Sequence, residues 1–274
     1  MNPGFVHLRL HTEYSLVDSV IRVPELMRAT AAQGMPALGL TDQGNLFALI
    51  KFYEEAEETG IKPIVGADLR VRDGDNGETA LITLLCCDHR GYLNLSSLIT
   101  RSYLEGQTRG QPVLEREWFE GHSGGLIALS GGREGDVGKA LLAGRDAEAH
   151  ARLASWRVLF PGRYYLELQR TGREGETEYL EAAVRLAAAT GVPVVATNDV
   201  RFIKADEFEA HEARVCIQEG RVLDDPRRQR FYSEQQYLKN AAEMARLFAD
   251  LPEALENSVE IGRASCRERV SYHV

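Results

Sequence analysis

The sequence predicts an α/β protein built as a closed or nearly closed β/α barrel. Short apolar segments alternate with amphipathic helical segments about seven times along the 274 residues, an order typical of a parallel sheet covered by helices. A doubly wound open sheet is the alternative. Nucleotide-binding sheets of that kind are disfavoured because no Gly-x-Gly-x-x-Gly follows the first strand and no Gly-Lys-Ser/Thr loop occurs.

The first predicted strand, residues 5–11, has two unlike faces. One face is apolar, whereas the other carries a His-x-Arg-x-His pattern formed by His7, Arg9 and His11. Polar groups inside a buried sheet need partners, a metal ion or water. This face is therefore either one wall of a site or the wet side of an edge strand.

The other elements follow from apolar periodicity and from residues that begin or end helices. Pro24 suits the first turn of a helix, Gly60 and Gly191 follow helix ends, and Ser233 has capping-box spacing to Gln236. We expect strands at residues 35–40, 63–71, 80–87, 125–129, 164–169 and 192–197, with a polar hairpin at 72–79. We expect helices at residues 24–33, 46–59, 92–103, 136–142, 146–160, 174–190 and 207–219, loops at 106–111 and 224–230, and a last helix from Ser233.

Composition indicates an ordinary globular protein of a reducing compartment. The chain is 44% hydrophobic and 27% charged, and no apolar run approaches the roughly 20 residues of a membrane span. Its N-terminus has no signal-peptide character, no Cys-x-x-Cys pair occurs, and Cys86 adjoins Cys87. We expect a cytoplasmic protein without a membrane partner. The net charge of −9 argues against nucleic-acid binding by this segment alone.

Polar side chains gather where the predicted strands end, which is the site edge of a β/α barrel. They are His11, Asp42-Gln43, Asp68, Gly131-Gly132 and Asp199-Val200-Arg201. Carboxylates and an imidazole suit a divalent metal. Alternatively, Asp42 caps the following helix and Asp199 is a turn residue. Arg9 and Arg201 argue against an intact metal cluster, because guanidinium groups repel a cation and can pair with the remaining carboxylates.

Five stretches resemble the PHP (polymerase and histidinol phosphatase) domain in the form that begins bacterial replicative DNA polymerase III α subunits. They keep the family's order and spacing from about residue 5 to residue 260, and are FVHLRLHTEYSLVDS, MPALGLTDQGNLFALIKFY, GIKPIVGADLRV, GLIALSGGREGDVG and VPVVATNDVRFI. The resemblance implies a distorted, TIM-like, seven-stranded β/α barrel over residues 1–260. The sequence then departs from the family, and we expect residues 261–274 to be a non-native or disordered tail.

The resemblance also implies where a metal cluster would lie and how far it has decayed. Active family members hold up to three metals through nine ligands. Here His11, Asp18 and Asp199 match ligands, and Asp68 replaces a glutamate. Five positions hold residues that bind cations poorly: Arg9, Gln43, Leu81, Gly132 and Arg201. We expect a vestigial site without catalytic residues and without metal; a residual ion would use His11, Asp18, Asp68 and Asp199.

The implied role is structural support within the polymerase subunit and a docking platform for its proofreading exonuclease (ε) subunit. The resemblance implies further partners outside this chain, namely the rest of the α subunit, a sliding clamp and DNA. It also implies that the whole polymerase uses Mg²⁺, whereas this fragment lacks the polymerase active site and needs no cofactor. Two alternatives stay open: an active metal-dependent PHP phosphoesterase or 3′–5′ exonuclease, and a small-molecule barrel with Arg9 and Arg201 as an anion clamp.

Overall fold

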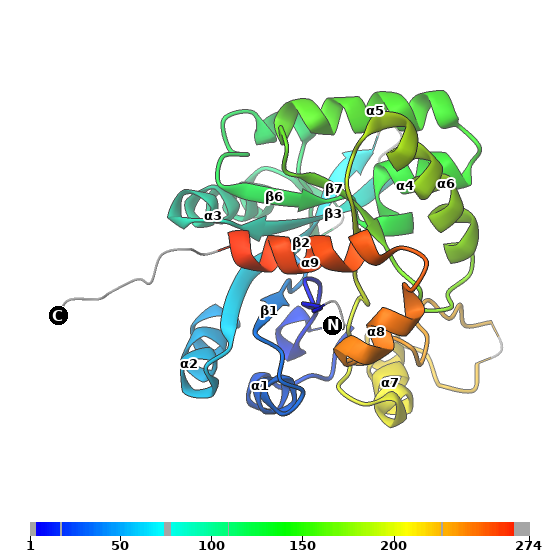
Figure 1. Ribbon diagram of the computed structural model, residues 1–274. Coiled ribbons are helices and arrows are strands. Elements are labelled where there is room, and N and C mark those ends of the chain that lie inside the picture. The colour runs from blue at the N-terminus through cyan, green and yellow to red at the C-terminus, as the bar shows by residue number, and fades with distance from the viewer. Residues whose placement is uncertain (1–3, 17, 74–77, 109, 226, 266–274) are drawn as a thin grey trace.

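A computed structural model describes residues 4–16, 18–73, 78–108, 110–225 and 227–265, and Figure 1 shows its elements. The strands are β1 (Ala37–Leu40), β2 (Lys62–Asp73), β3 (Glu78–Cys86), β4 (Gln107–Thr108), β5 (Gln111–Pro112), β6 (Leu126–Leu129), β7 (Tyr164–Leu168) and β8 (Val194–Ala196). The α-helices are α1 (Val23–Ala32), α2 (Leu49–Thr59), α3 (His89–Leu104), α4 (Asp136–Leu142), α5 (Asp146–Leu159), α6 (Glu176–Thr190), α7 (Phe208–Glu219), α8 (Ala241–Leu247) and α9 (Pro252–Ala264). No helix among these residues is long and apolar enough to cross a membrane.

The main sheet is curled, and the N-terminal segment closes it into the predicted distorted barrel. Its six strands have the order β1-β2-β3-β6-β7-β8. Residues 5–11 lie between the two end strands: the amide of Gly39 donates to the carbonyl of His7 at 2.6 Å, and the amide of His11 donates to the carbonyl of Val200 at 3.0 Å. This extended segment takes the place of a seventh strand, although it pairs with its neighbours through an isolated bridge, between Leu10 and Val200, rather than a ladder.

The expectation of a parallel sheet is wrong at β3, whereas the hairpin expected between β2 and β3 is confirmed by their antiparallel pairing. This strand pairs antiparallel with both β2 and β6, whereas the β1–β2, β6–β7 and β7–β8 pairs are parallel. Only residues 74–77, which lie outside the described residues, separate β2 from β3. A connection this short permits only antiparallel pairing, because a parallel return needs a crossover of a dozen or more residues.

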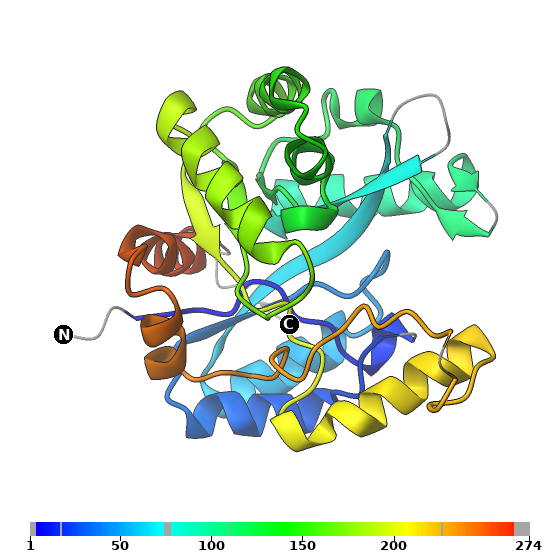
Figure 2. The same cartoon turned by 90° about the vertical axis from the view of Figure 1, so that its right-hand side faces the viewer.

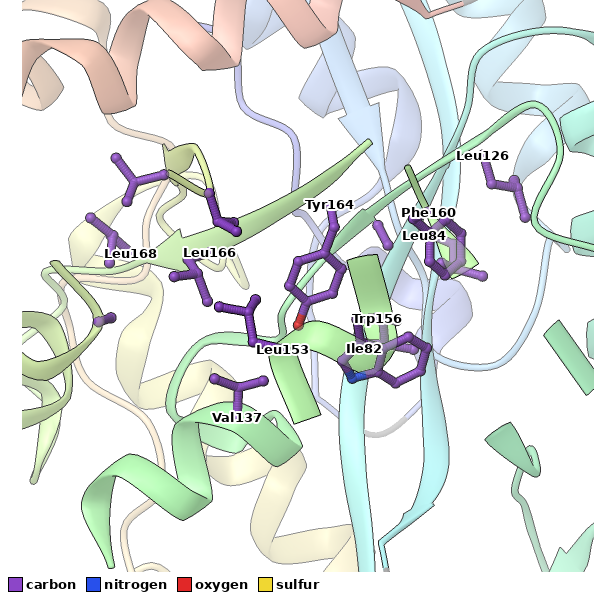
Figure 3. Close-up of a cluster of buried hydrophobic side chains, with 14 of the residues drawn as sticks. Ile82, Leu84, Leu126, Val137, Leu153, Trp156, Phe160, Tyr164, Leu166 and Leu168 are labelled. Carbon is purple, nitrogen blue, oxygen red and sulfur yellow. The ribbon is translucent and has the colours of Figure 1, made fainter. Parts of the chain in front are cut away.

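The largest apolar core lies between the sheet and helices α3–α6, which Figure 1 shows together on one side of the sheet. Figure 3 shows its aromatic centre, where the rings of Trp156 and Tyr164 stack with centroids 6.1 Å apart. The indole Nε1 of Trp156 also donates to both carboxylate oxygens of Asp136, at 2.9 and 3.0 Å. The indole thus anchors α5 both to the sheet and to the start of α4.

The inside of the barrel has an apolar layer below a polar layer. The apolar layer includes Leu85 and Val195, together with Ile261 from α9, the red helix that crosses the sheet in Figure 1. Thr83 lies two residues before Leu85, and Thr197 lies two residues after Val195. Both face the same interior with polar side chains. The alternation within each strand therefore places polar side chains in one layer of the barrel interior and apolar side chains in the next.

Two expectations about the C-terminal third need correction. The predicted helix from Ser233 is absent; the next helix is α8, which begins after the capping box of Asn240 and Glu243. The predicted boundary at residue 260 is also misplaced, because α9 continues to Ala264 with Ile261 and Ser265 buried. Residues 266–274 of the predicted tail lie outside the described residues. The predicted loop at 106–111 contains the short β4–β5 hairpin.

Candidate functional site

The polar layer of the barrel holds a buried cluster of arginines and carboxylates. Arg9, from the closing segment, is 1% exposed. Its Nε donates to Asp68 Oδ2 at 2.7 Å and lies 3.4 Å from Asp199 Oδ1, and its Nη1 lies 3.4 Å from Glu167 Oε1. One guanidinium therefore neutralises carboxylates from β2, β7 and the turn after β8. Burial disfavours its charge, but these carboxylates raise the pKa of Arg9 well above its ordinary value.

Arg201 lies at the other side of the same cluster. Its Nη1 donates to Asp18 Oδ2 and its Nη2 to Asp199 Oδ1, each at 2.6 Å. The expectation that Arg9 and Arg201 pair with Asp18, Asp68 or Asp199 is thereby confirmed. Burial raises the pKa of Asp18 and of Asp199, but the neighbouring positive charges, with Arg201 the strongest, together outweigh it and hold both well below their usual range. Both carboxylates are therefore ionised and matched by guanidinium groups.

His11 bridges two of these carboxylates. Its Nδ1 lies 2.9 Å from Asp18 Oδ1 and its Nε2 lies 2.9 Å from Asp68 Oδ2, while Arg201 Nη1 also contacts Nδ1. Burial and the Arg201 charge lower the pKa of His11, but Asp18 and Asp68 outweigh them and raise it to about 9. The imidazole is therefore charged at neutral pH and donates from both nitrogens.

Asp199 is held in an unusual backbone conformation. Its φ of 45° lies in the left-handed region that non-glycine residues seldom adopt. Besides the arginines already named, Arg173 Nη1 lies 3.0 Å from Asp199 Oδ2, and Gln236 Nε2 donates to the same oxygen at 2.9 Å. Asp199 is thus more than a turn residue: its carboxylate is the centre at which three guanidinium groups meet.

Asp42 stabilises the loop beside the cluster and does not cap a helix, contrary to the alternative drawn from the sequence. Helix α2 begins only at Leu49. The Asp42 carboxylate accepts from the Thr12 amide at 2.6 Å, the Thr12 hydroxyl at 2.7 Å and the Ser15 hydroxyl at 2.7 Å. Burial raises its pKa. The neighbouring Gln43 reaches this region through its backbone, whose amide donates to Ser15 Oγ at 3.0 Å.

Leu81 and Gly132 lie at the side of the polar layer next to β7. Leu81 is two residues from Thr83, whose hydroxyl donates to Asp68, so both side chains face the interior. Gly132 has a φ of 60°, and a Cβ built there would lie 3.4 Å from Gln169 Oε1. Neither residue offers a ligand atom, and the amide side chain of Gln169 fills the space beside Gly132.

Four buried residues of the cluster were missed by the sequence analysis: Glu167, Gln169, Arg173 and Gln236. Period-two alternation along the predicted strand at 164–169, which corresponds to β7, could have identified Glu167 and Gln169, since both fall on its interior face. Arg173 and Gln236 come from irregular segments, and the one pattern there, the capping-box spacing of Gln236 to Ser233, does not point to a site. Burial raises the pKa of Glu167, and its Oε2 has no hydrogen-bond partner among the described residues.

The segment between α7 and α8 crosses the mouth of the barrel; it is the orange connection in Figure 2. The Tyr232 hydroxyl donates to Asp18 Oδ2 at 3.3 Å, and Asn198 Nδ2 donates to the carbonyls of Gln235 and Tyr237 at 2.9 and 2.8 Å. Gln236 accepts from the Arg201 amide at 2.8 Å. These bonds require an extended backbone, which explains why no helix forms from Ser233.

The cluster does not fit a metal centre. The four remaining ligand candidates, His11, Asp18, Asp68 and Asp199, already direct their polar atoms at one another or at guanidinium groups. In the described part of the chain, no group of three or more His, Cys, Asp or Glu side chains is arranged to hold a metal ion. The arginines supply the positive charge that metal ions would otherwise bring.

The chain is thus a curled α/β barrel with a buried polar cluster at its mouth. The profile of the PHP domain family matches residues 7–171, and the chain belongs to this family.

Its sequence is similar to DNA polymerase III subunit alpha of Pseudomonas aeruginosa, with 55% identity over 264 residues, and to that of Escherichia coli K12, with 51% identity over 262 residues. The two alignments cover 96% and 95% of this chain, but 22% and 23% of the relatives, so the chain spans less than a quarter of their length. Among solved structures, an amidohydrolase from Chromobacterium violaceum matches with a TM-score of 0.49 and 15% identity, covering 77% of this chain and 97% of that chain.

Proposed function

We propose that this chain is the PHP-domain portion of a DNA polymerase III α subunit and that it acts there as a non-catalytic support. The observation that carries the proposal is the pairing of two buried guanidinium groups with the carboxylates of the site. Arg9 and Arg201 stand at two ligand positions of the family pattern, and each is paired with carboxylates of the same site. A hydrolytic centre needs a metal-bound water, and paired arginines cannot generate one.

The second part of the proposal is that the domain serves as a docking platform for the proofreading exonuclease subunit, the ε subunit. The support for this part is the resemblance of the sequence to the N-terminal region of DNA polymerase III α subunits. Polymerisation itself, its Mg²⁺, the sliding clamp and the DNA belong to the parts of the relatives that lie outside this chain. The place of action would be the cytoplasm.

The metal content of the purified chain tests the first part. We expect near-zero stoichiometry by elemental mass spectrometry after incubation with zinc and manganese followed by desalting. Asp199→Ala is the matched variant, because it removes the carboxylate that a residual site would need most. Two or three tightly bound ions that disappear in Asp199→Ala would overturn the proposal and favour an active phosphoesterase or exonuclease.

The docking role needs a separate experiment, in which purified ε subunit is passed over the immobilised chain. Saturable binding is expected. Absence of binding to a chain that melts cooperatively would refute the docking role, while the metal result would still decide whether the site is catalytic.

A further inference from the structure

Residues 227–239 cross the mouth of the barrel without forming a helix or a strand, and we call them the strap; they lie in the orange connection of Figure 2. Within the strap, Gln236, Leu238 and Lys239 are buried, and the others are half-buried or exposed. Even the aromatic side chain of Phe231 is 48% exposed. The strap is therefore held by polar contacts rather than by an apolar core, which is typical of segments that open locally.

Gln236 fastens the strap to the turn after β8. Its side-chain Nε2 donates to the carbonyl and to Oδ2 of Asp199, at 3.0 and 2.9 Å, and its own carbonyl accepts from the Arg201 amide at 2.8 Å. Two residues later, the Leu238 amide donates to the carbonyl of Phe202 at 3.1 Å. These bonds connect this half of the strap to one short segment, residues 199–202.

Arg228 anchors the other half of the strap to α7. Its Nη2 lies 2.6 Å from Glu212 Oε2, and the two side chains are 4% and 5% exposed. Between the two anchors, the Tyr232 ring packs edge-on against His211 with centroids 4.6 Å apart, and its hydroxyl donates to Asp18 Oδ2 at 3.3 Å. The strap thus has an anchor in each half and contacts the ion-pair cluster between them.

Closure of the barrel does not depend on the strap. The backbone bonds that complete the ring join the amide of Gly39 to the carbonyl of His7 and the amide of His11 to the carbonyl of Val200. None of these four residues belongs to the strap. Release of the strap would therefore remove bonds at the mouth and leave the ring hydrogen-bonded.

We propose that the strap is a gate that opens as one unit while the barrel stays closed, and that its opening admits water to the ion pairs of Arg201. With the strap in place, the side chains of Asp18, Asp199 and Arg201 are 7%, 1% and 4% exposed. Because ion pairs weaken when water enters their surroundings, the closed strap strengthens this part of the cluster. The gate concerns access to the barrel interior and does not depend on the support or docking role.

Hydrogen exchange of single amides, followed by NMR, tests the proposal. The amide of Leu238 reports on the strap, and the amides of Gly39 and His11 report on barrel closure. In the parent, we expect Leu238 to exchange at least tenfold faster than the two closure amides. Gln236→Ala should speed exchange at Leu238 at least a further fivefold and leave the closure amides unchanged. Gln235→Ala, at an adjacent and exposed residue of the same type, is the matched control and should exchange as the parent does.

Opening as one unit is tested from the other anchor. Arg228→Gln removes the ion pair with Glu212 at a position remote in the strap from Leu238. If the strap opens as a whole, this variant should also speed exchange at Leu238 at least fivefold. Arg227→Gln is its matched control, because it alters an adjacent arginine whose side chain is 84% exposed, and it should have no effect.

Two results would overturn the proposal. A common exchange rate for Leu238, Gly39 and His11 in the parent would show that the strap opens only when the barrel does. Faster exchange at Leu238 in Gln236→Ala but not in Arg228→Gln would show that the strap frays at one end instead of opening as a unit. Melting temperatures check the fold of each variant, and the comparison within the parent stands even if a variant fails to fold.

Discussion

Arg9 Nε and Asp68 Oδ2 lie 2.7 Å apart with side chains that are 1% and 0% exposed. Arg9 lies in the N-terminal segment that closes the barrel and Asp68 lies in β2, so this ion pair links the closing segment to the sheet. A buried charge is tolerated only when it is paired and hydrogen-bonded. Arg9 therefore helps to hold the barrel closed, and this role can be tested through stability.

Replacement of either cluster arginine should destabilise the fold. Arg9→Ala would leave Asp68 without its guanidinium, and Arg201→Ala would leave Asp18 without one and Asp199 with only those of Arg9 and Arg173. We expect each variant to lose about 3–5 kcal/mol of unfolding free energy, since a buried carboxylate is left uncompensated. Urea denaturation followed by circular dichroism measures the loss. Arg263→Ala, on an exposed pair, should change stability by less than about 0.5 kcal/mol; equal effects at the three positions would contradict the prediction.

The charged state of His11 should make stability depend on pH on the alkaline side. Its pKa is about 9 in the folded protein, above its ordinary 6.5. A raised pKa stabilises the fold in full below pH 6.5, and this contribution is lost as the pH rises through 9. We expect the stability difference between the parent and His11→Gln to shrink steadily over this window. Urea midpoints at several pH values measure the difference.

The comparison must be made against the variant, because other groups titrate nearby. Burial lowers the pKa of Lys239 to about 8, so above pH 8 this amine has an effect of the opposite sign. Burial likewise lowers the pKa of His7 to about 4, which costs stability only below pH 6.5. A parent-to-variant difference that stays constant from pH 6.5 to 9 would show that His11 is neutral in the folded protein.

The sequence pattern predicted the barrel and the strand ends because alternation and helix-ending glycines are local signals. Alternation alone could not give the direction of β3, since it is the same in parallel and antiparallel strands; the polar hairpin expected at 72–79 was the one signal for antiparallel pairing with β2. The sequence pattern identified Arg9, His11, Asp68, Asp199 and Arg201, which lie on or next to strands. Arg173 and Gln236 were missed because they reach Asp199 from irregular segments, and only tertiary structure brings those segments together. Asp42 was misjudged for the same reason, since its partners Thr12 and Ser15 lie about 30 residues away in the chain.

Closure of the barrel requires glycine at position 39. A Cβ built on Gly39 would lie 2.6 Å from the carbonyl oxygen of Leu8, in the segment that completes the ring. Because backbone rather than a flexible side chain blocks the space, Gly39→Ala must push the N-terminal closing segment away from β1. We expect this to cost about 1–3 kcal/mol or more of unfolding free energy. Gly60→Ala is the comparison at a helix end: nothing lies within 4 Å there, but its φ of 71° makes any side chain strained, at a cost of about 1 kcal/mol. Thermal denaturation should show the larger loss at position 39, and protection from hydrogen exchange should fall at residues 7–10; unchanged exchange there would contradict this explanation.

The hydrogen bonds from Trp156 to Asp136 can be separated from the packing of the indole ring. Asp136 is 4% exposed, and its carboxylate accepts from Trp156 Nε1 and also pairs with Arg116. Trp156→Phe keeps most of the apolar contact but removes the donor, so a loss of about 1–3 kcal/mol is expected. Trp156→Ala also removes the contacts with Phe119 and Tyr164, and should lose about 3–5 kcal/mol. Trp118→Phe is the matched control: this half-buried indole packs under Arg101, so the substitution should cost less than Trp156→Phe. If the two phenylalanine variants unfold at the same urea concentration, the bond to Asp136 contributes nothing, and the anchoring of α5 rests on ring packing alone.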